Sequence, residues 1–294
     1  MFLIIGANGF LGSYLIKNAL EQTNDNILAT DLSLPEENSN PRVNWVKCDI
    51  TKIEDLQNIK KLTEKEKDLK VIFLAAYHKP DLVLQNPKIA WNVNVIALAN
   101  FLYIMDNIKK MYYPSTEVVY GQGIDGYKFK EDDKLNPANK YGELKTIAER
   151  MVNVSGFNVV RFPVLMGPSV APNKKHFFDE IVEKLRNGEK MEMFKDQFRS
   201  MIDFDTASKI VISLIENPEA QQYKIVNIAG DEKLSKYELA IRIAEKYGLN
   251  KDNVIGISMD SDNKIFTAKR SKETILDNSL VKKILGLKEL KIKI

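Results

Sequence analysis

The 294-residue sequence contains one cysteine and only two histidines. Cys48 has no second cysteine with which to form an internal disulfide, which fits a reducing compartment, and we expect a cytoplasmic protein. Structural zinc sites draw mainly on cysteine and histidine, so a zinc ion here would depend on carboxylates. The composition therefore predicts no metal site.

Long apolar runs and an excess of charge of one sign are also missing. No run approaches the roughly 20 residues that span a bilayer, and the apolar stretch Met1–Ile5 leads into a glycine loop instead of continuing as a secretory leader does. The 43 basic and 40 acidic residues are too evenly balanced to favour nucleic acid as a partner. Since 44% of the residues are hydrophobic, we expect a globular protein with a sizeable core and with neither membrane nor nucleic acid as partner.

The first half of the chain alternates short apolar runs with amphipathic stretches. The pattern predicts strands over Phe2–Ile5, Ile27–Thr30, Val43–Val46, Val71–Ala75, Met111–Pro114 and Asn158–Phe162. It predicts helices over Phe10–Gln22, Ile53–Lys67, Pro87–Ile108 and Pro137–Val154. Strands that alternate with helices form parallel βαβ units, and continuously apolar strands are typical of a sheet covered on both faces. We predict an α/β fold with a Rossmann-type, doubly wound parallel sheet.

The pattern changes after Gly167. Helices are predicted near residues 177–187, 206–216, 235–247 and 279–285, with short strands near residues 225–228 and 254–257. No linker rich in proline, glycine or serine separates the two halves. We expect a dinucleotide-binding domain over residues 1–166 and a smaller C-terminal α/β substrate lobe over residues 167–294, with elements that can interleave.

Gly6, Gly9 and Gly12 lie between the first predicted strand and the first predicted helix, in the motif G-A-N-G-F-L-G. Glycines at such a turn let the backbone approach a pyrophosphate, and the start of the helix offers free N–H groups. The first gap is one residue longer than in the commonest dinucleotide fingerprint. A turn without a ligand is the alternative, but the position directly after a strand favours a dinucleotide site.

Two acidic residues follow neighbouring predicted strands. Asp31 ends the second strand, where a carboxylate can accept hydrogen bonds from an adenosine ribose and repel a 2′-phosphate. It favours NAD as the cofactor, with NADP as the alternative. Asp49 follows the third strand within reach of an adenine amine, although an aspartate that opens a turn or helix is also common.

Tyr141 and Lys145 lie at positions i and i+4 of a predicted helix and therefore share one face. A nearby ammonium stabilises a phenolate, so we expect a lowered tyrosine pKa and a tyrosine that exchanges protons. The lysine can also hold the nicotinamide ribose. This spacing is common on solvated helices, but the order of glycine loop, Asp31, Thr116 and then this pair favours a catalytic role.

Ser115 and Thr116 directly follow the strand predicted over Met111–Pro114. The carboxyl edge of a parallel sheet faces the ligand crevice, so a hydroxyl there can bind the substrate oxygen at the carbon that gains or loses hydride. We assign this role to Thr116. Capping of the strand end by the two hydroxyl groups is the alternative.

Together these motifs resemble the extended short-chain dehydrogenase/reductase family of nucleotide-sugar epimerases, dehydratases and reductases. G-A-N-G-F-L-G, D-L, L-A-A, S-T-E-V-V-Y-G and Y-G-E-L-K occur in the family's order, and the resemblance covers nearly the whole chain. We expect dinucleotide contacts from Gly6, Asn8, Gly9, Phe10, Leu11, Gly12, Asp31, Leu32, Asp49, Ile50, Leu74, Ala75, Ala76, Tyr141, Lys145 and Pro163.

The second half is similar to one branch, the dTDP-4-dehydrorhamnose reductase-like proteins. The likeness lies in R-F-P-V-L-M-G, V-N-I-A-G, L-S-K-Y-E-L-A and R-S-K-E. It implies that Arg199 and Arg270 bind the substrate's diphosphate, for which guanidinium geometry is suited; a plain surface charge is the alternative for each. Substrate contacts are expected from His78, Thr116, Glu117, Val164, Arg199 and Arg270.

Two positions depart from the family pattern. Many epimerases carry asparagine where this chain has Val164. The 4,6-dehydratases carry a glutamate where this chain has Val118, and valine cannot accept a proton as the dehydration requires. A dehydratase is thereby disfavoured most strongly. Glu117 is either an auxiliary acid or an outward-pointing residue, and His78 is better interpreted as a loop histidine than as a proton donor.

The preferred hypothesis is an NAD(P)-dependent reductase of a C4 keto group on a nucleotide-linked sugar. Tyr141 would protonate the forming alkoxide and Thr116 would hydrogen-bond the same oxygen. The alternatives are a C4 epimerase with tightly held NAD and a dinucleotide-binding regulatory subunit without turnover. The resemblance also implies a homodimer, built from the helices predicted over Pro87–Ile108 and Pro137–Val154.

Overall fold

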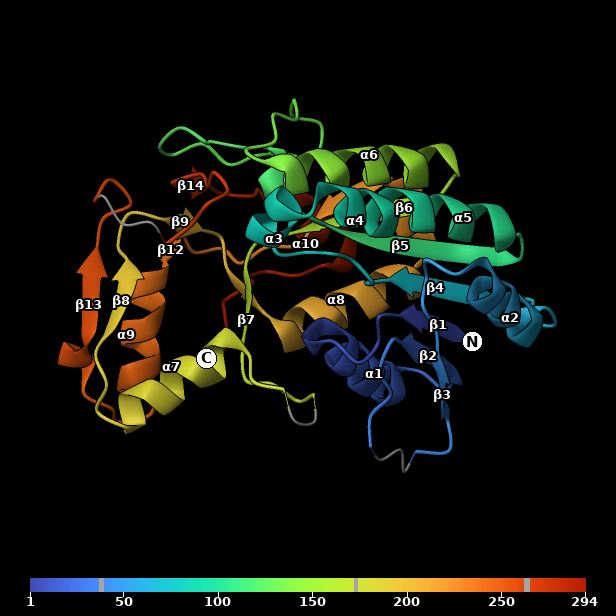
Figure 1. Ribbon diagram of the computed structural model, residues 1–294, viewed down its shortest axis with the longest axis horizontal. Helices are drawn as coiled ribbons and strands as arrows, with labels where there is room; N and C mark the ends of the chain where they lie inside the picture. Colours follow the sequence, from blue (N-terminus) through green and yellow to red (C-terminus); the bar gives the residue numbers. More distant parts are fainter. Residues whose placement is uncertain (37–39, 172–173, 262–264) are drawn as a thin grey trace.

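The central feature of the computed structural model is a seven-stranded parallel sheet (Figure 1). The structure describes residues 1–36, 40–171, 174–261 and 265–294. The strand order is β11-β6-β5-β4-β1-β2-β3, with β1 (Phe2–Ile5), β2 (Ile27–Asp31), β3 (Val43–Lys47), β4 (Leu69–Phe73), β5 (Ile108–Thr116), β6 (Asn158–Phe162) and β11 (Ile225–Asn227). The order reverses between β1 and β4, and ligands of such sheets bind at the carboxyl edge beside this switch point. The predicted Rossmann-type fold is confirmed.

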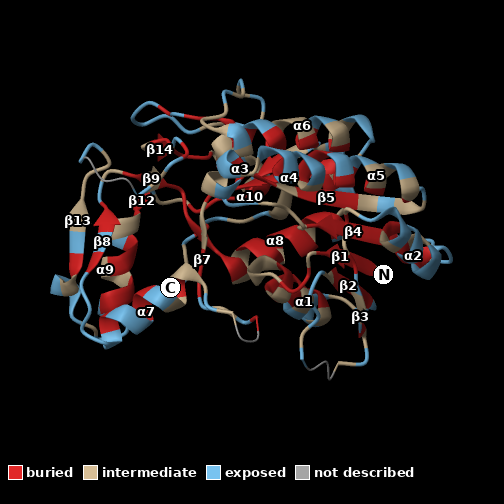
Figure 2. Cartoon of the chain, in the orientation of Figure 1, coloured by how far each residue is buried: buried red, intermediate tan, exposed pale blue. Residues whose placement is uncertain are grey.

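Helices cover both faces of the sheet. One face packs on α1 (Phe10–Gln22), α8 (Phe204–Glu216) and α10 (Ser279–Leu285). The other packs on α2 (Ile53–Thr63), α5 (Ala97–Ile104) and α6 (Lys140–Val154). Figure 2 shows the buried strands between these two layers. No helix in the described part of the chain combines the length and apolar character needed to cross a membrane.

A second lobe lies at the carboxyl side of the sheet (Figure 1). Its core joins α7 (Phe177–Arg186) and α9 (Lys236–Lys246) to the paired strands β8 (Met191–Phe194) and β13 (Val254–Ile257). Short strands connect it to the sheet layer, namely β7 (Leu165–Met166) with β10 (Ile202–Asp203), and β12 (Leu234–Ser235) with β9 (Phe198–Arg199) and β14 (Glu273–Thr274).

The chain crosses between the two lobes more than once. The structure places α8, β11 and α10 on the central sheet, although all three lie after residue 166. Their apolar faces complete the core that α1 alone leaves open, since α1 and α8 pack side by side. The two lobes are therefore not divided by one boundary between residues 166 and 167, and elements from the second half of the chain interleave with the first domain.

Several expected element boundaries are wrong. The helix expected over Pro87–Ile108 consists of α4 (Pro87–Trp91), a π-helical turn (Asn92–Ile96) and α5, and Ile108 already belongs to β5. A separate helix, α3 (Pro80–Gln85), precedes it. Helix α6 begins at Lys140 because the Asn139 side chain accepts a hydrogen bond from Gly142 N (3.1 Å) and caps the helix. Short 3-10 turns lie at Glu117–Val119, Pro218–Gln222 and Lys251–Asn253.

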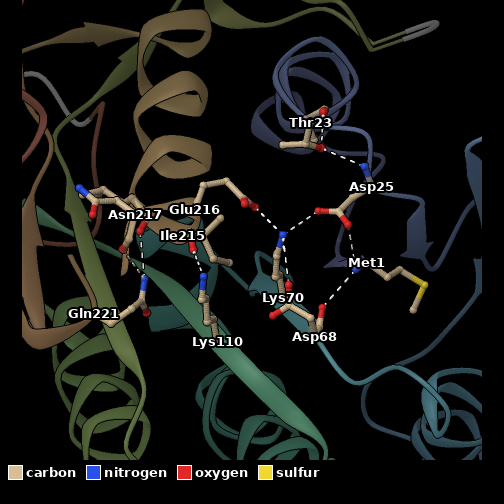
Figure 3. A network of polar contacts seen from close by, with 12 residues as sticks. Met1, Thr23, Asp25, Asp68, Lys70, Lys110, Ile215, Glu216, Asn217 and Gln221 are labelled. Carbon is tan, nitrogen blue, oxygen red and sulfur yellow. Dashed lines mark hydrogen bonds and ion pairs between the residues drawn. The ribbon is translucent and has the colours of Figure 1, made fainter. Parts of the chain in front are cut away.

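A cluster of charges closes the amino edge of the sheet, opposite the predicted site (Figure 3). Lys70 on β4 places its ammonium 2.7 Å from Asp25, 2.8 Å from Glu216 and 3.4 Å from Asp68. The Met1 amine lies 3.1 Å from Asp25. Because Glu216 ends α8, this buried lysine ties the second half of the chain to the first.

Candidate functional site

The glycine loop connects β1 to α1. Gly6 has φ +82°, and a Cβ there would lie 2.7 Å from Ala75 N, while a Cβ at Gly12 would lie 2.3 Å from the Ala7 carbonyl oxygen. The chain's own packing therefore requires both of these glycines. A Cβ at Gly9 would meet only the Gly6 carbonyl oxygen, at an ordinary 3.4 Å. The packing does not require glycine at this position, which leaves open space at the start of the helix.

Helix α1 begins at Phe10 with Gly9 as N-cap, and no side chain caps it. Its first N–H groups are thus available to a phosphate. Asp31 stands beside them at the end of β2, where its carboxylate accepts a hydrogen bond from Asn8 N (3.1 Å). The Asn8 side chain donates to the Ser33 carbonyl oxygen (2.8 Å) and fixes the loop against β2. An open glycine cradle, an uncapped helix start and a positioned carboxylate fit a dinucleotide.

The other expected dinucleotide contacts differ in their surroundings and in their exposure. Asp49 caps the turn before α2, since its Oδ1 accepts hydrogen bonds from Thr51 N (3.0 Å) and Thr51 Oγ1 (2.6 Å). Leu74 N and Ala75 N donate to the Ile5 carbonyl oxygen (2.8 and 3.1 Å), which holds the segment after β4 beside the loop. Ile50 and Pro163 are buried, Leu32 is exposed, and Phe10, Leu11 and Ala76 are half-buried. Their contacts with a dinucleotide stay predictions.

Lys145 is buried between α6 and β5. Its ammonium donates to Tyr113 Oη (2.7 Å) and to the Pro114 carbonyl oxygen (2.5 Å), and it lies 3.9 Å from the centre of the Tyr113 ring. Burial lowers the pKa of Lys145 to about 7. The side chain is therefore held in place by β5 and close to its point of deprotonation at neutral pH.

Tyr141 differs from the expectation. Burial, followed by the negative charge of Glu117, raises the pKa of Tyr141 above its ordinary value. A lowered pKa was expected from Lys145, but the ammonium of that residue is engaged by β5 instead. Within the described chain the Tyr141 hydroxyl makes no hydrogen bond, so a protonated phenol faces any ligand that binds here.

Gly142, next to the tyrosine, allows α6 to approach the end of β5. A Cβ at Gly142 would lie 2.9 Å from Pro137 Cβ and 3.0 Å from the Val118 carbonyl oxygen. A larger residue would push the first turn of α6 away from Pro137 and Val118. The Y-G-x-x-K spacing thus serves packing as well as chemistry.

Thr116 ends β5 and is connected to the second lobe through Glu117. Thr116 Oγ1 donates to Glu117 Oε2 (3.2 Å), and Glu117 Oε1 accepts a hydrogen bond from Arg199 Nε (3.1 Å). Glu117 is buried, and burial raises the pKa of its carboxyl against the opposing effect of Arg199. It points inward, so the outward-pointing alternative is wrong.

The two arginines expected to bind a diphosphate already have partners. Arg199 is buried, and its remaining donors bond the carbonyl oxygens of Phe198 (2.7 Å) and Ser271 (3.0 Å). Arg270 donates to Asp81 Oδ2 (2.7 Å) and to the Ala268 carbonyl oxygen. Their role in binding a diphosphate stays a prediction, and for Arg199 the structure shows a bridge between Glu117 and the second lobe.

The structure brings Thr116, Glu117 and Arg199 into one hydrogen-bonded chain, with Tyr141 and Lys145 beside it on α6. His78 is exposed in the loop before α3, and Val164 is half-buried against the core of the second lobe. Four further residues were given no role from the sequence, namely Asp81, Tyr113, Gly142 and Lys236. Gly142 and Lys236 lie inside the motifs Y-G-E-L-K and L-S-K-Y-E-L-A, and Tyr113 lies in the strand that leads to Thr116, so these three carried a usable signal.

Comparisons with known proteins agree with this fold. Residues 1–293 match the model of the RmlD substrate binding domain family. The chain belongs to this family. The beta subunit of methionine adenosyltransferase 2 from Xenopus tropicalis is 27% identical over 290 residues, which cover 96% of this chain and 81% of that protein.

Solved structures show the same architecture. A dTDP-4-dehydrorhamnose reductase from Bacillus anthracis, in complex with NADP, has a TM-score of 0.79 at 22% identity and covers 99% of this chain and 94% of its own. A UDP-glucuronic acid 4-epimerase from Bacillus cereus, with UDP-glucuronic acid and NAD, has a TM-score of 0.81 at 19% identity, covering 98% and 93%. At these identities the likeness concerns the fold.

Proposed function

We propose that the protein is an NAD(P)-dependent oxidoreductase that reduces a keto group, at C4, of a nucleotide-linked sugar. The observation that carries the proposal is the arrangement at the end of β5. Thr116, the buried Lys145 and a Tyr141 hydroxyl that bonds to none of the described residues lie there, at the carboxyl edge of the sheet where the glycine loop also starts. Family membership and the dinucleotide complexes of the structural neighbours support the same conclusion.

Each residue has a defined task in this reaction. The nicotinamide supplies the hydride when the dinucleotide is bound. Tyr141 gives its proton to the oxygen of the carbonyl being reduced, which suits a phenol that burial keeps protonated. Thr116 hydrogen-bonds the same oxygen. Lys145, held by Tyr113, supports the ribose and returns a proton toward Tyr141.

Turnover of 4-keto nucleotide sugars tests the proposal. We would measure NADH and NADPH oxidation with a panel that includes dTDP-4-dehydrorhamnose, comparing the wild type with Tyr141→Phe. Loss of the proton donor should slow turnover by about 10²–10⁴-fold. Tyr247→Phe is a matched control, because Tyr247 directly follows α9 and its exposed side chain lies outside the site. This variant should turn over at the wild-type rate. Equal rates for the Tyr141→Phe variant and the wild type would contradict the proposal.

A C4 epimerase is the nearest alternative within the same chemistry. Asp31 favours NAD, and one structural neighbour is a 4-epimerase with bound NAD. The half-buried Val164 argues against it, since it offers no polar contact to a sugar. An epimerase purifies with NAD and interconverts sugars without net cofactor consumption, whereas a reductase consumes one NAD(P)H per product.

A regulatory role is favoured by one observation. The relative that aligns over 96% of this chain is a subunit of methionine adenosyltransferase. A regulator would bind dinucleotide, co-purify with a partner enzyme and turn over no keto sugar. The complete set of Thr116, Tyr141 and Lys145 supports the reductase instead.

A cytoplasmic homodimer is part of the proposal. Ile89, Ile96 and Tyr103 are exposed at seven-residue intervals along α4, the π-helical turn and α5, and Val154 is exposed at the end of α6. A second copy of the chain could cover this face as a four-helix bundle. Sedimentation of the wild type should give a dimer and that of Ile96→Glu a monomer; a monomeric wild type refutes this assembly.

A further inference from the structure

Lys236 is fixed at the start of α9 by an N-terminal capping box. Ser235 Oγ accepts a hydrogen bond from Glu238 N (3.1 Å), and Ser235 N donates to Glu238 Oε2 (2.7 Å). The two reciprocal bonds set the direction in which the first turn of the helix leaves β12. Lys236 is the first residue of the helix, so the capping box fixes the position of its backbone and the direction in which its side chain starts.

The ammonium of Lys236 lies among aromatic rings and other cations. Its Nζ is 5.5 Å from the ring centres of both Phe177 and Phe266, and the Arg270 guanidinium lies 4.7 Å from the same Phe266 ring. Burial, and then the positive charges of Arg199 and Arg270, lower the pKa of Lys236 to about 8. Burial and the two like charges disfavour the ammonium, whereas the faces of the two rings attract it without offering a hydrogen-bond acceptor.

Lys236 differs from the two arginines in having no acceptor in the described part of the chain. Arg199 is paired with Glu117 and with backbone carbonyl groups, and Arg270 with Asp81. Among the described residues, Lys236 Nζ makes neither a hydrogen bond nor an ion pair. A half-buried cation without an acceptor, beside like charges, lowers stability in the absence of an anion. Binding of an anion would offset that loss.

The Lys236 ammonium lies near the residues proposed to carry out the reaction. Glu117 interacts electrostatically with Lys236 and with Tyr141, and it bonds Thr116 directly. Lys236 on α9 and Tyr141 on α6 therefore both lie within electrostatic range of the same buried carboxylate. Phe266 and Arg270 also line a surface pocket of about 280 Å³, which provides space for a ligand beside them.

We propose that Lys236 binds the diphosphate of the nucleotide-linked sugar, at the place that the family resemblance assigns to Arg199. This inference rests on the proposed function. A diphosphate offers several oxygens to one ammonium and to the neighbouring Arg270 guanidinium, and lysine binds phosphate as a compact charge. Arg199 instead holds Glu117 and the backbone of the second lobe in position.

Calorimetric titration of nucleotides tests the inference without turnover. Full-length protein saturated with NAD would be titrated with UDP and dTDP, and separately with UMP and dTMP. Lys236→Met, which keeps most of the length of the side chain but removes its charge, should weaken nucleoside diphosphate binding by roughly 10–100-fold. Monophosphate binding should change by less than about threefold. Lys246→Met, at the exposed end of the same helix, should leave all affinities unchanged.

Thermal unfolding without nucleotide gives a second readout. Because Lys236 has no acceptor within residues 1–36, 40–171, 174–261 and 265–294, Lys236→Met should unfold at the wild-type temperature or above it. Lys236→Arg should restore diphosphate binding. Unchanged diphosphate affinity in Lys236→Met overturns the inference while the proposed function stands. Equal losses for mono- and diphosphates, or a lowered unfolding temperature, also overturn it. A wild type that binds none of the four nucleotides refutes the proposed function and this inference with it.

Discussion

Removal of the Arg199 guanidinium should destabilise the protein in a way that depends on pH. The guanidinium and the Glu117 carboxylate are 3.1 Å apart, with side chains only 7% and 6% exposed. Arg199→Met keeps most of the volume but leaves the carboxylate buried without its cation. Breaking a buried pair on one side costs about 3–5 kcal/mol.

The pH dependence follows from the direction of the Glu117 shift. Burial already raises the pKa of this carboxyl in the folded protein above that of the unfolded chain. A raised carboxyl pKa means that the folded state holds more protons, so its stability falls as pH rises toward the folded pKa. Without Arg199 the pKa of Glu117 in the folded protein rises further. Each additional pKa unit lowers the free energy of unfolding by about 1.4 kcal/mol at pH values above that pKa. The deficit of Arg199→Met should therefore be small near pH 5 and large at pH 8.

Urea unfolding at pH 5 and pH 8 measures this difference. Glu117→Gln combined with Arg199→Met should recover part of the stability at pH 8, because the uncompensated charge is gone. Arg242→Met is the control: its pair with Glu232 is about 40% exposed, and its loss should cost less than about 1 kcal/mol at either pH. An Arg199→Met deficit that is equal at both pH values, or below about 1 kcal/mol at pH 8, would refute the reasoning.

Other consequences concern the lysines and the glycine loop. Tyr113→Phe removes one of the two acceptors of Lys145, so the pKa of Lys145 should fall further. The alkaline limb of the pH–kcat/KM profile should then move to lower pH, and an unshifted limb would contradict this prediction. Gly9→Ala should fold normally but bind NADH more weakly in a fluorescence titration. Gly12→Ala should lower the unfolding temperature, because the packing of the chain requires glycine there. Equal losses of unfolding temperature in both variants would contradict the different roles given to the two glycines. Lys70→Met should cost about 1–2 kcal/mol at pH 7, since its carboxylates are partly exposed. Asp25, whose pKa its partners hold low against burial, contributes stability that is lost as pH falls, so this deficit should shrink below about pH 4; a constant urea-unfolding deficit contradicts it.

The central sheet was predictable because its strands are short, apolar and separated by amphipathic helices. β1, the glycine loop and α1 follow one another with the same boundaries as expected. The three-residue strand β11 was expected in the second lobe, because nothing local distinguishes an apolar strand of one sheet from that of another. Its pairing with β6 is set by tertiary contact. The end of α5 was missed because residues 105–107 carry neither glycine nor proline to stop a helix.

The candidate site was predictable only as far as its motifs extend. Tyr141 and Lys145 could be proposed from spacing, and Thr116 from its position at a strand end. The raised Tyr141 pKa could not be predicted, because it comes from burial of the phenol and from the nearby charge of Glu117, and both depend on the tertiary structure. Arg199 meets Glu117 across 82 positions of sequence, and such a pairing leaves no local signal.

Transfer of deuterium from the nicotinamide to the sugar tests the central claim most directly. The protein would be incubated with a 4-keto nucleotide sugar and NADH labelled with deuterium at nicotinamide C4, using each of the two labelled epimers in turn. Mass spectrometry should then detect one deuterium in the reduced sugar with one of the epimers, and a much lower yield with Tyr141→Phe. A product without deuterium from either epimer, or no reduced product from any keto sugar of the panel, would contradict the assignment of this site to hydride transfer.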